Sequence, residues 1–228
     1  MPVSIDTVYQ RGLALANKEQ RGYITPLEFN LLANQAQLDI FEQYFYDLNQ
    51  FDAVGDTVDV EIADNVEWTQ EKMSIFKNDH VSIASNNLPI DLYRLINIVK
   101  NGIIIEEVTR EELHRCWHSK LTQPTPLTPV YVRDRNMFRA WENTSGLMTQ
   151  PFNITYIRKP KKVEWGYNVV IGKALYNSNT SKHFELHASE ESKLVTIILE
   201  LAGITIYKPG LVTLADSMKA AKLQQQKA

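Results

Sequence analysis

The sequence predicts an α+β fold, because helical and strand-like periodicities occupy different parts of the chain. Apolar residues recur at helical spacing near both ends, whereas the middle contains short alternating runs separated by turn signals. We expect an N-terminal helical hairpin over residues 1–51, a β-rich middle region with hairpins and a short helix over 52–188, and C-terminal helices over 189–228. The C-terminal helices are expected to pack with the N-terminal ones in one folded unit.

Two helices are expected in the N-terminal region. Ser4 or Asp6 can cap the first of them. The second begins after Thr25, because Thr25 and Glu28 have the spacing of a capping box, in which each residue bonds the backbone amide of the other. Apolar residues at helical spacing then continue to about residue 50, and the remaining positions are rich in asparagine and glutamine.

The middle region begins with strand-like patterns. Residues 57–62 and 81–84 alternate between apolar and polar side chains, as half-buried strands do. Residues 92–99 and 103–108 flank Asn101-Gly102, a pair that favours the positive φ angles of a tight hairpin turn. This stretch is the strongest hairpin signal in the chain.

The rest of the middle region mixes helix, connector and strand. Thr109 and Glu112 form a second capping box, which predicts a short helix to about Ser119. Three prolines make residues 123–129 an extended connector. Residues 131–141 then indicate another hairpin and residues 152–159 another strand.

The chain returns to helix at its C-terminal end. Residues 189–203 predict a helix that ends at Gly203, because glycine commonly terminates helices. A last amphipathic helix is expected near residues 211–225.

Charge is distributed unevenly along the chain, although the net charge is only −3. Up to residue 80 there are 5 Lys and Arg against 14 Asp and Glu, a net charge of −9; from residue 81 there are 19 against 13, a net charge of +6. Oppositely charged halves can attract copies of the chain head to tail, or bind two different partners. They can equally be two solvated faces of a monomer.

The sequence contains few features that indicate where in the cell the protein resides. The single cysteine, Cys116, excludes an internal disulfide framework and fits a reducing compartment. No stretch approaches the ~20 consecutive apolar residues of a membrane span. The first residues lack the basic and apolar segments of a signal peptide, so we expect no export by that route and no membrane partner.

Residues 17–28 have the outline of a calcium-binding loop, with Gly22 at the sixth position and Glu28 at the twelfth. Its fifth position, where an oxygen ligand is needed, holds Arg21, which has no lone pair to donate. We therefore interpret the stretch as a turn followed by a helix start.

Catalytic and metal-binding patterns are weak. His114 and His118 are four residues apart on an expected helix, and His183 and His187 repeat that spacing, which can place two imidazoles near one zinc ion. Neither pair has the glutamate of a metalloprotease motif, and we interpret all four as partly exposed histidines. The sequence contains no nucleophile motif and no glycine-rich phosphate loop. We expect no catalytic, metal or cofactor site, and a protein that is not an enzyme.

Residues 158–162, with sequence RKPKK, are the best candidate for nucleic-acid contact, because Trp165 and Tyr167 follow four cations. The chain is net negative and has no domain-wide basic face, which favours two alternatives: a solvated strand end, or contact with an acidic patch on a neighbouring subunit. Residues 39–79, with 11 acids against 2 lysines, could supply that patch. A DNA-binding helix-turn-helix over residues 5–50 is disfavoured, because acids on its second helix would repel phosphate. The candidate subunit-interface residues are Asp39, Glu42, Asp47, Arg158, Lys159, Lys161 and Lys162.

Several stretches together resemble structural proteins of tailed bacteriophages. They are LPIDLYRLINIVKNGIIIEEVTREEL (88–113), PVYV (129–132), ITYIRKPKKVEWGY (154–167) and FELHASEESKLVTIILELAGITI (184–206). The resemblance is to adaptor or ring proteins of the head-to-tail connector in marine and crAss-like podovirus-type phages. It covers most of the chain and rests on its layout and recurring phrases.

The resemblance implies a virion protein, made in the host cytoplasm, that forms a ring, commonly of twelve copies, below the portal. It also implies contacts with the portal and with tail or other neck proteins, and non-specific contact with the genomic DNA that passes through the channel. No cofactor or catalytic residue comes with it. The alternatives are another virion position, in the tail tube or associated with the capsid, and a small calcium- or nucleic-acid-binding module.

Overall fold

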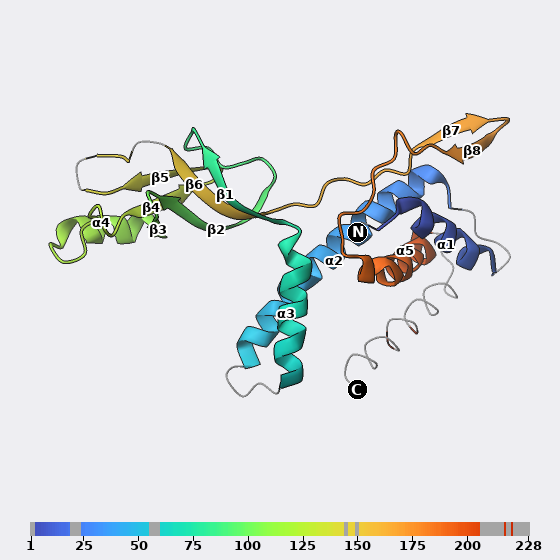
Figure 1. The fold of residues 1–228 in the computed structure, drawn as a ribbon, viewed down its shortest axis with the longest axis horizontal. Helices are drawn as coiled ribbons and strands as arrows, with labels where there is room; N and C mark the ends of the chain where they lie inside the picture. The colour runs from blue at the N-terminus through green and yellow to red at the C-terminus, as the bar shows by residue number, and fades with distance from the viewer. Residues whose placement is uncertain are drawn as a thin grey trace. The chain divides into compact units, whose positions relative to one another are not determined.

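The chain divides into two compact units (Figure 1). We call residues 1–75 and 160–228 the helical unit and residues 76–159 the sheet unit. The chain combines five described helices, most of them near its ends, with a mixed six-stranded sheet in its middle, which confirms the α+β class. The computed structural model describes residues 3–18, 24–54, 60–143, 146–148, 151–205, 217 and 220.

The helical unit is built on α2 (Pro26–Val54), a helix of 29 residues. It also contains α1 (Ile5–Lys18), α3 (Val60–Ser74) and α5 (Glu191–Thr205), which follows a 3-10 turn, η1 (Ala188–Glu190). Helices α1 and α2 both pack on α5, and α3 packs on α2. The N-terminal helices and α5 therefore share one core. No helix in the described ranges has both the length and the apolar character that crossing a bilayer requires.

The two N-terminal helices start where local hydrogen bonds favour a start. The Glu28 amide donates to Thr25 Oγ1 at 3.3 Å and the Thr25 amide donates to Glu28 Oε2 at 3.0 Å, which confirms the capping box of α2. Ser4 precedes α1, and its hydroxyl accepts a hydrogen bond from the Thr7 amide at 3.5 Å. Of the two candidate caps, Ser4 holds that position, and Asp6 lies in the first turn of α1.

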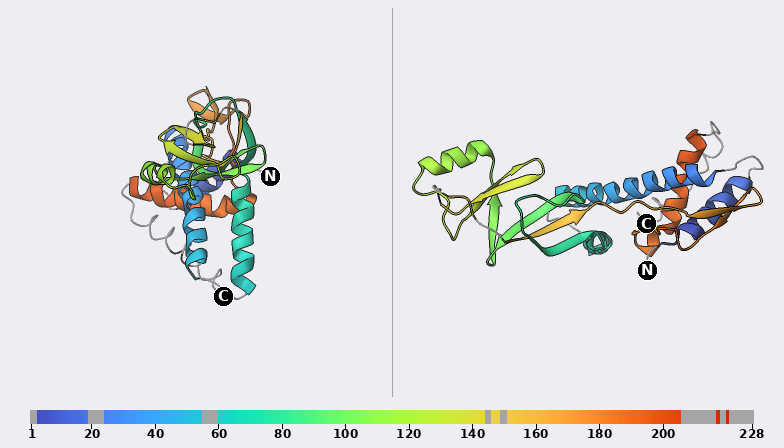
Figure 2. Two further views of the ribbon diagram at one scale, coloured as in Figure 1. Left: turned by 90° about the vertical axis from the view of Figure 1, so that its left-hand side faces the viewer. Right: turned by 90° about the horizontal axis from the view of Figure 1, so that it is seen from above.

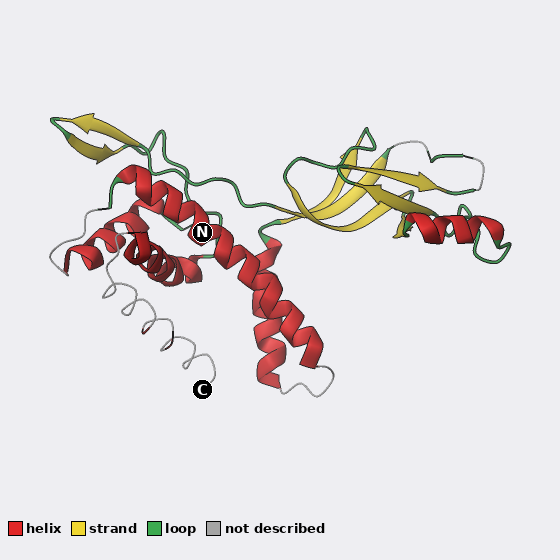
Figure 3. Cartoon of the chain, turned by 180° about the vertical axis from the view of Figure 1, so that it is seen from behind, coloured by secondary structure: helices red, strands yellow, loops and turns green. Residues whose placement is uncertain are grey.

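The sheet unit contains a six-stranded mixed sheet in the order β1-β6-β2-β3-β4-β5 (Figure 3). Strands β3 and β4 are parallel and are connected through α4 (Arg110–His118), whereas the other neighbouring strands are antiparallel. The strands are β1 (Lys77–Ile83), β2 (Leu92–Lys100), β3 (Ile103–Glu107), β4 (Val130–Asp134), β5 (Met137–Trp141) and β6 (Phe152–Arg158).

The two predicted hairpins are confirmed. Residues 123–129 belong to no helix or named strand, as their prolines predict, but they are not fully extended, because Thr125 and Thr128 bond each other across a turn. Asn101 and Gly102 have φ angles of 53° and 81° at the β2–β3 turn, as the Asn-Gly signal predicts. Side chains alternate across β4. Tyr131 packs in the main core of the sheet unit with Phe138 and Phe152. Val130 and Val132 point to the other face and pack against α4.

The capping box of α4 makes a testable prediction. The Thr109 amide donates to Glu112 Oε2 at 2.8 Å and the Thr109 hydroxyl donates to the same oxygen at 2.9 Å. These two hydrogen bonds lower the pKa of the Glu112 carboxyl. A pKa that is lower in the folded state stabilises the fold above the unfolded-state pKa, and this contribution is lost as the pH falls through the folded-state pKa. We expect Thr109→Val to raise the pKa of Glu112 toward its ordinary value, measured by an NMR titration of the carboxyl carbon.

Thr122→Val, outside the capping box, is the control and should leave the Glu112 titration unchanged. Coincident titration curves for the Thr109→Val variant and the unsubstituted chain would show that the threonine hydroxyl contributes nothing to the cap.

Two expected elements differ in the structure, and a third lies almost entirely outside the described residues. The strand expected over residues 57–62 is wrong: residues 60–62 begin α3, and residues 55–59 lie outside the described ranges. The short alternation leads into a run rich in Glu, Gln, Lys and Met, which favour helix, and the longer helical segment prevails. Gly203 does not end α5, which continues to Thr205 with Gly203 buried inside it. Apart from Ser217 and Ala220, which are helical, the helix expected near 211–225 lies outside the described residues.

The helical unit also contains a two-stranded hairpin that periodicity did not indicate. It consists of β7 (Tyr167–Val170) and β8 (Lys173–Tyr176). The turn residues Ile171 and Gly172 have φ angles of 51° and 71°. Asn or Gly is preferred at both positions of such a turn. The isoleucine at the first position therefore gave no turn signal in the sequence.

Candidate functional site

The exposed side of α2 is acidic. The 29 residues of α2 include five acids and no lysine or arginine. Residues spaced three or four apart along this helix lie on one side of it. We call that side the outer face of α2, and it consists of Leu27, Leu31, Gln35, Asp39, Glu42 and Tyr46. Three of its members are apolar or aromatic and are 58–67% exposed.

The three predicted interface acids on α2 are at or beside this face. Glu42 is exposed and Asp39 is half-buried on the outer face itself. The Gln35 amide donates to Asp39 Oδ1 at 2.7 Å. Asp47 lies further around the helix, where its carboxylate accepts a hydrogen bond from Gln43 at 2.6 Å. These carboxylates stay near the surface, where a cationic partner can reach them.

A different side of α2 holds an extended stretch of chain, residues 161–165, by side-chain amides. The Trp165 amide donates to Asn30 Oδ1 at 2.7 Å, and Asn30 Nδ2 donates to the Trp165 carbonyl at 3.3 Å. The Val163 amide donates to Asn34 Oδ1 at 3.0 Å, and Asn34 Nδ2 returns a hydrogen bond to the Val163 carbonyl at 2.9 Å. Each asparagine therefore pairs with the backbone of one residue, as a neighbouring strand would.

A glutamine one turn further along α2 continues this pattern. Gln37 Nε2 donates to the Lys161 carbonyl at 2.8 Å, and Gln37 Oε1 accepts from the Glu185 amide at 3.3 Å. We call Asn30, Asn34 and Gln37 the amide ladder. It fixes alternate residues of the extended stretch against α2, which runs alongside it in Figure 2. The abundance of asparagine and glutamine in α2 was evident from its composition, but the placement of these three on one side was not.

The predicted basic stretch spans both units. Arg158 and Lys159 belong to the sheet unit, where the Arg158 guanidinium lies 5.7 Å from the centre of the Phe76 ring. Lys161 and Lys162 belong to the helical unit and are exposed. Lys161 Nζ lies 3.8 Å from Glu185 Oε1, with 79% of its side chain accessible. Such an exposed pair is weak, so Lys161 is available to a partner.

The aromatic residues after the basic stretch do not act together as a nucleic-acid platform. Trp165 is 2% exposed, and its indole Nε1 donates to Asp6 Oδ1 at 3.0 Å. Its ring packs against Tyr9 at 4.4 Å, Tyr167 at 5.7 Å and Tyr176 at 5.9 Å between centroids. A buried indole cannot stack on a base, so Trp165 does not support nucleic-acid binding by this stretch.

The β7–β8 hairpin exposes apolar side chains beyond this aromatic cluster. Val169 is 68% exposed, Ile171 97% and Leu175 52%. Cross-strand pairing puts Tyr167, Val169, Ala174 and Tyr176 on one face. Exposed apolar patches of this kind mark interaction sites. Sequence reasoning missed this surface because it missed the hairpin.

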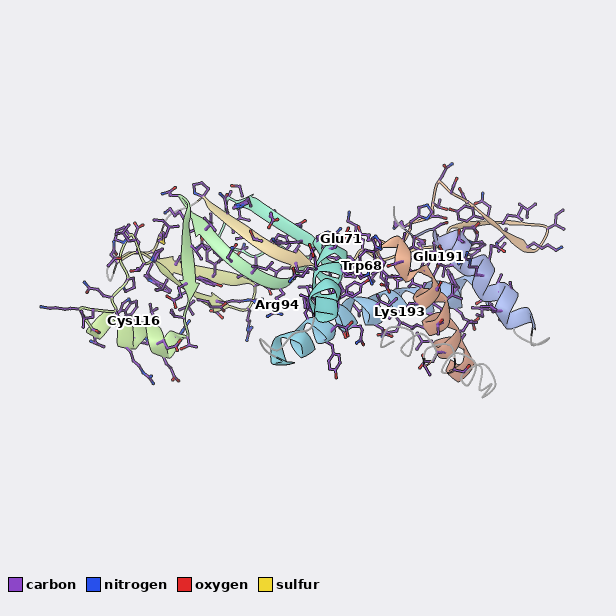
Figure 4. All side chains as sticks on the ribbon, turned by 60° about the horizontal axis from the view of Figure 1, so that its bottom comes forward. Trp68, Glu71, Arg94, Cys116, Glu191 and Lys193 are labelled. Carbon is purple, nitrogen blue, oxygen red and sulfur yellow. The ribbon has the colours of Figure 1, made fainter. Side chains whose placement is uncertain are left out.

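A buried ion pair joins three elements of the helical unit. Lys72 Nζ on α3 lies 2.7 Å from Glu190 Oε1 at η1. The ammonium also lies 5.9 Å from the ring centre of Tyr44 on α2 and 5.4 Å from that of Trp68, which is labelled in Figure 4. Burial, with the negative charge of Glu190, raises the pKa of the Tyr44 hydroxyl, which stays protonated.

The histidines have packing and capping contacts. The His114 ring packs edge-on against Trp117 at 5.3 Å on α4, where Cys116 is half-buried (Figure 4). His183 Nδ1 accepts a hydrogen bond from the Ile5 amide at 3.3 Å, and His187 Nδ1 accepts one from the Ser189 amide. Among the described residues, no three His, Cys, Asp or Glu side chains are grouped to hold a metal ion.

The suggested calcium loop is only partly within the described residues. Residues 19–23 lie outside them. The carboxylate of Glu28, its twelfth position, bonds the amide and hydroxyl of Thr25, and these hydrogen bonds lower the pKa of Glu28. In this structure Glu28 therefore belongs to the capping box at the N-terminus of α2.

A shallow cavity of about 190 Å³ lies between α4 and the β4–β5 hairpin. Arg110, Asp134 and Arg139 are among its polar lining groups, and Trp117 and Trp141 among its aromatic ones. Its volume is below the ~300–1,000 Å³ typical of small-molecule sites. A more open cavity of about 610 Å³ adjoins it and falls within that range, with Glu107, Glu112 and Arg133 among its lining residues. The two oppositely charged surfaces of the helical unit are the stronger candidate for function. Comparison of the chain with family models and with curated proteins found no match.

Proposed function

We propose that this chain is a structural subunit of the head-to-tail connector of a tailed bacteriophage, in which copies of it form a ring. The observation that carries the proposal is that the helical unit has two different surfaces of opposite charge. The outer face of α2 is acidic and partly apolar, and exposed Lys161 and Lys162 lie on the extended stretch that leads into an apolar hairpin. Two unlike, complementary surfaces on one subunit produce a heterologous contact, which closes into a ring when its rotation permits.

The phage assignment is supported by the resemblance of four stretches of the sequence to connector proteins. In that setting the ring lies below the portal, contacts the portal and tail or neck proteins, and encloses the DNA exit channel. Its contact with DNA is non-specific, and it performs no catalysis. Native mass measurement of the purified chain, alone and mixed with its portal, tests this proposal. A ring, alone or on the portal, is expected, and a protein that stays monomeric in both samples contradicts it.

The basic stretch is tested by charge reversal. Lys161→Glu with Lys162→Glu places two anions where the proposed partner surface is itself acidic, so we expect self-association to weaken by about tenfold or more. The fold should persist, because the Lys161 side chain is 79% exposed while its backbone carbonyl accepts a hydrogen bond from Gln37. Sedimentation velocity measures the association, and circular dichroism checks the fold.

The matched control is Lys77→Glu with Lys120→Glu, which changes the net charge equally but lies in the sheet unit. We expect this control to associate nearly as the unsubstituted chain does. Equal association of both double variants would remove Lys161 and Lys162 from the interface.

A further inference from the structure

We infer that the β7–β8 hairpin docks on the outer face of α2 of a second copy of this chain. The inference rests on the proposed self-assembly and assigns its two contacting surfaces. It begins from the turn of the hairpin. Ile171 has a φ of 51°, a conformation that disfavours β-branched residues, and its side chain is 97% exposed. Its side chain packs on almost nothing in the part of the chain that the structure describes, so no contact there offsets this local cost, and we assign the isoleucine to an external contact.

The hairpin is fixed at its base and exposed at its end. The Asn177 amide donates to the Gly166 carbonyl at 2.8 Å, and the Gly166 amide donates to Ser181 Oγ at 2.9 Å. A Cβ at Gly166 would lie 2.8 Å from the Thr180 backbone, so this close approach requires glycine. Trp165 packs against both tyrosines of the hairpin. An isolated two-stranded hairpin is marginally stable, and this anchoring holds it in a form that can insert into a partner.

Charge identifies the partner surface. The hairpin contains one lysine, Lys173, and no acid, and the stretch that leads into it carries Lys161 and Lys162. The α2 helix contains five acids and no lysine or arginine, and two of these acids, Asp39 and Glu42, are on the outer face. Leu27 and Leu31, on the same face, are 65% and 67% exposed. An apolar hairpin with positive charge therefore matches an apolar helix face with negative charge. Both surfaces are present in every copy of the chain.

Within one chain, the end of the hairpin and the outer face of α2 both stay exposed: Ile171 is 97% exposed and Leu31 67%. The amide ladder holds the stretch that leads into the hairpin against a different side of α2. We therefore assign the contact to the hairpin of one copy and the helix of another. A standard interface buries ~800 Å² per partner, so Lys161 and Lys162 are expected to join it.

Disulfide trapping tests this arrangement. In a Cys116→Ser background, one chain carries Ile171→Cys and another carries Leu31→Cys. We expect a disulfide-linked dimer when the two chains are mixed under mild oxidation. Ile171→Cys mixed with Leu121→Cys is the matched control, because Leu121 is also 97% exposed but lies in the sheet unit. Trapping no greater than in this control, or dimers of Ile171→Cys alone in equal yield, would overturn the inference.

An apolar-to-acid substitution adds a test that does not depend on cysteine geometry. Ile171→Asp should weaken self-association about tenfold, whereas Ile90→Asp, at a fully exposed position of the sheet unit, should not. Native mass measured on the same samples separates the two proposals. Oligomers without Ile171–Leu31 trapping would overturn the docking and leave the ring. Monomers without trapping, both in the chain alone and in its mixture with the portal, would overturn the docking and the self-assembly on which it rests.

Discussion

Replacing Lys72 with methionine should lower the free energy of unfolding by about 3–5 kcal/mol, the loss typical when one partner of a buried ion pair is removed. The Lys72 and Glu190 side chains are 14% and 6% exposed, and their charged atoms are 2.7 Å apart. Methionine fills a similar volume but leaves the Glu190 carboxylate without its counter-ion. The aromatic faces of Tyr44 and Trp68 also lose their cation.

Chemical denaturation followed by circular dichroism measures this effect, because most of the helix belongs to the unit that contains the pair. Lys182→Met is the control: Lys182 pairs with Glu164 at 3.3 Å, but both side chains are more than half exposed, so its loss should cost less than ~1 kcal/mol. Adding Glu190→Gln to Lys72→Met should recover part of the loss, because no unpaired charge then remains buried. Equal costs for the two lysine variants would mean that the Lys72 pair is as weak as a surface pair.

The features that the sequence predicted well depend on neighbours in the chain. Both capping boxes can be recognised in the sequence, because the two residues of each box are three positions apart: Thr25 with Glu28, and Thr109 with Glu112. Asn101-Gly102 similarly specifies the β2–β3 turn without help from the rest of the fold. Where this local chemistry was atypical, prediction failed: Ile171 occupies a turn position that normally signals itself by Asn or Gly.

The candidate surfaces depend on contacts between distant residues, and the sequence could show only part of them. The acids of α2 were evident from composition, and helical spacing put Asp39 and Glu42 on the exposed side. The burial of Trp165 was not evident, because its indole bonds Asp6, 159 positions away. The amide ladder joins residues 124 to 135 positions apart. Nothing in the order of residues indicates which extended stretch will meet which face of a helix.

Asn34→Ala should destabilise the chain by about 2–4 kcal/mol, because it leaves both backbone groups of one buried residue without a partner. Val163 is 3% exposed, and its amide and carbonyl both bond the Asn34 side chain. An unsatisfied buried polar group costs about 1–3 kcal/mol. Gln35→Ala is the control on the same helix turn: the side chain is exposed, and its loss should cost less than ~0.5 kcal/mol.

Asn34→Asp separates the two hydrogen bonds of the ladder. Its carboxylate can still accept from the Val163 amide but cannot donate to the Val163 carbonyl, so we expect a loss between those of the control and of Asn34→Ala. Hydrogen exchange at the Val163 amide should accelerate strongly in Asn34→Ala and much less in Asn34→Asp. Equal acceleration in both variants would mean that the extended stretch is held by packing alone. Because the amide ladder holds the extended stretch before the β7–β8 hairpin, Asn34→Ala should also loosen the base of that hairpin. We therefore expect it to reduce Ile171–Leu31 disulfide trapping between copies.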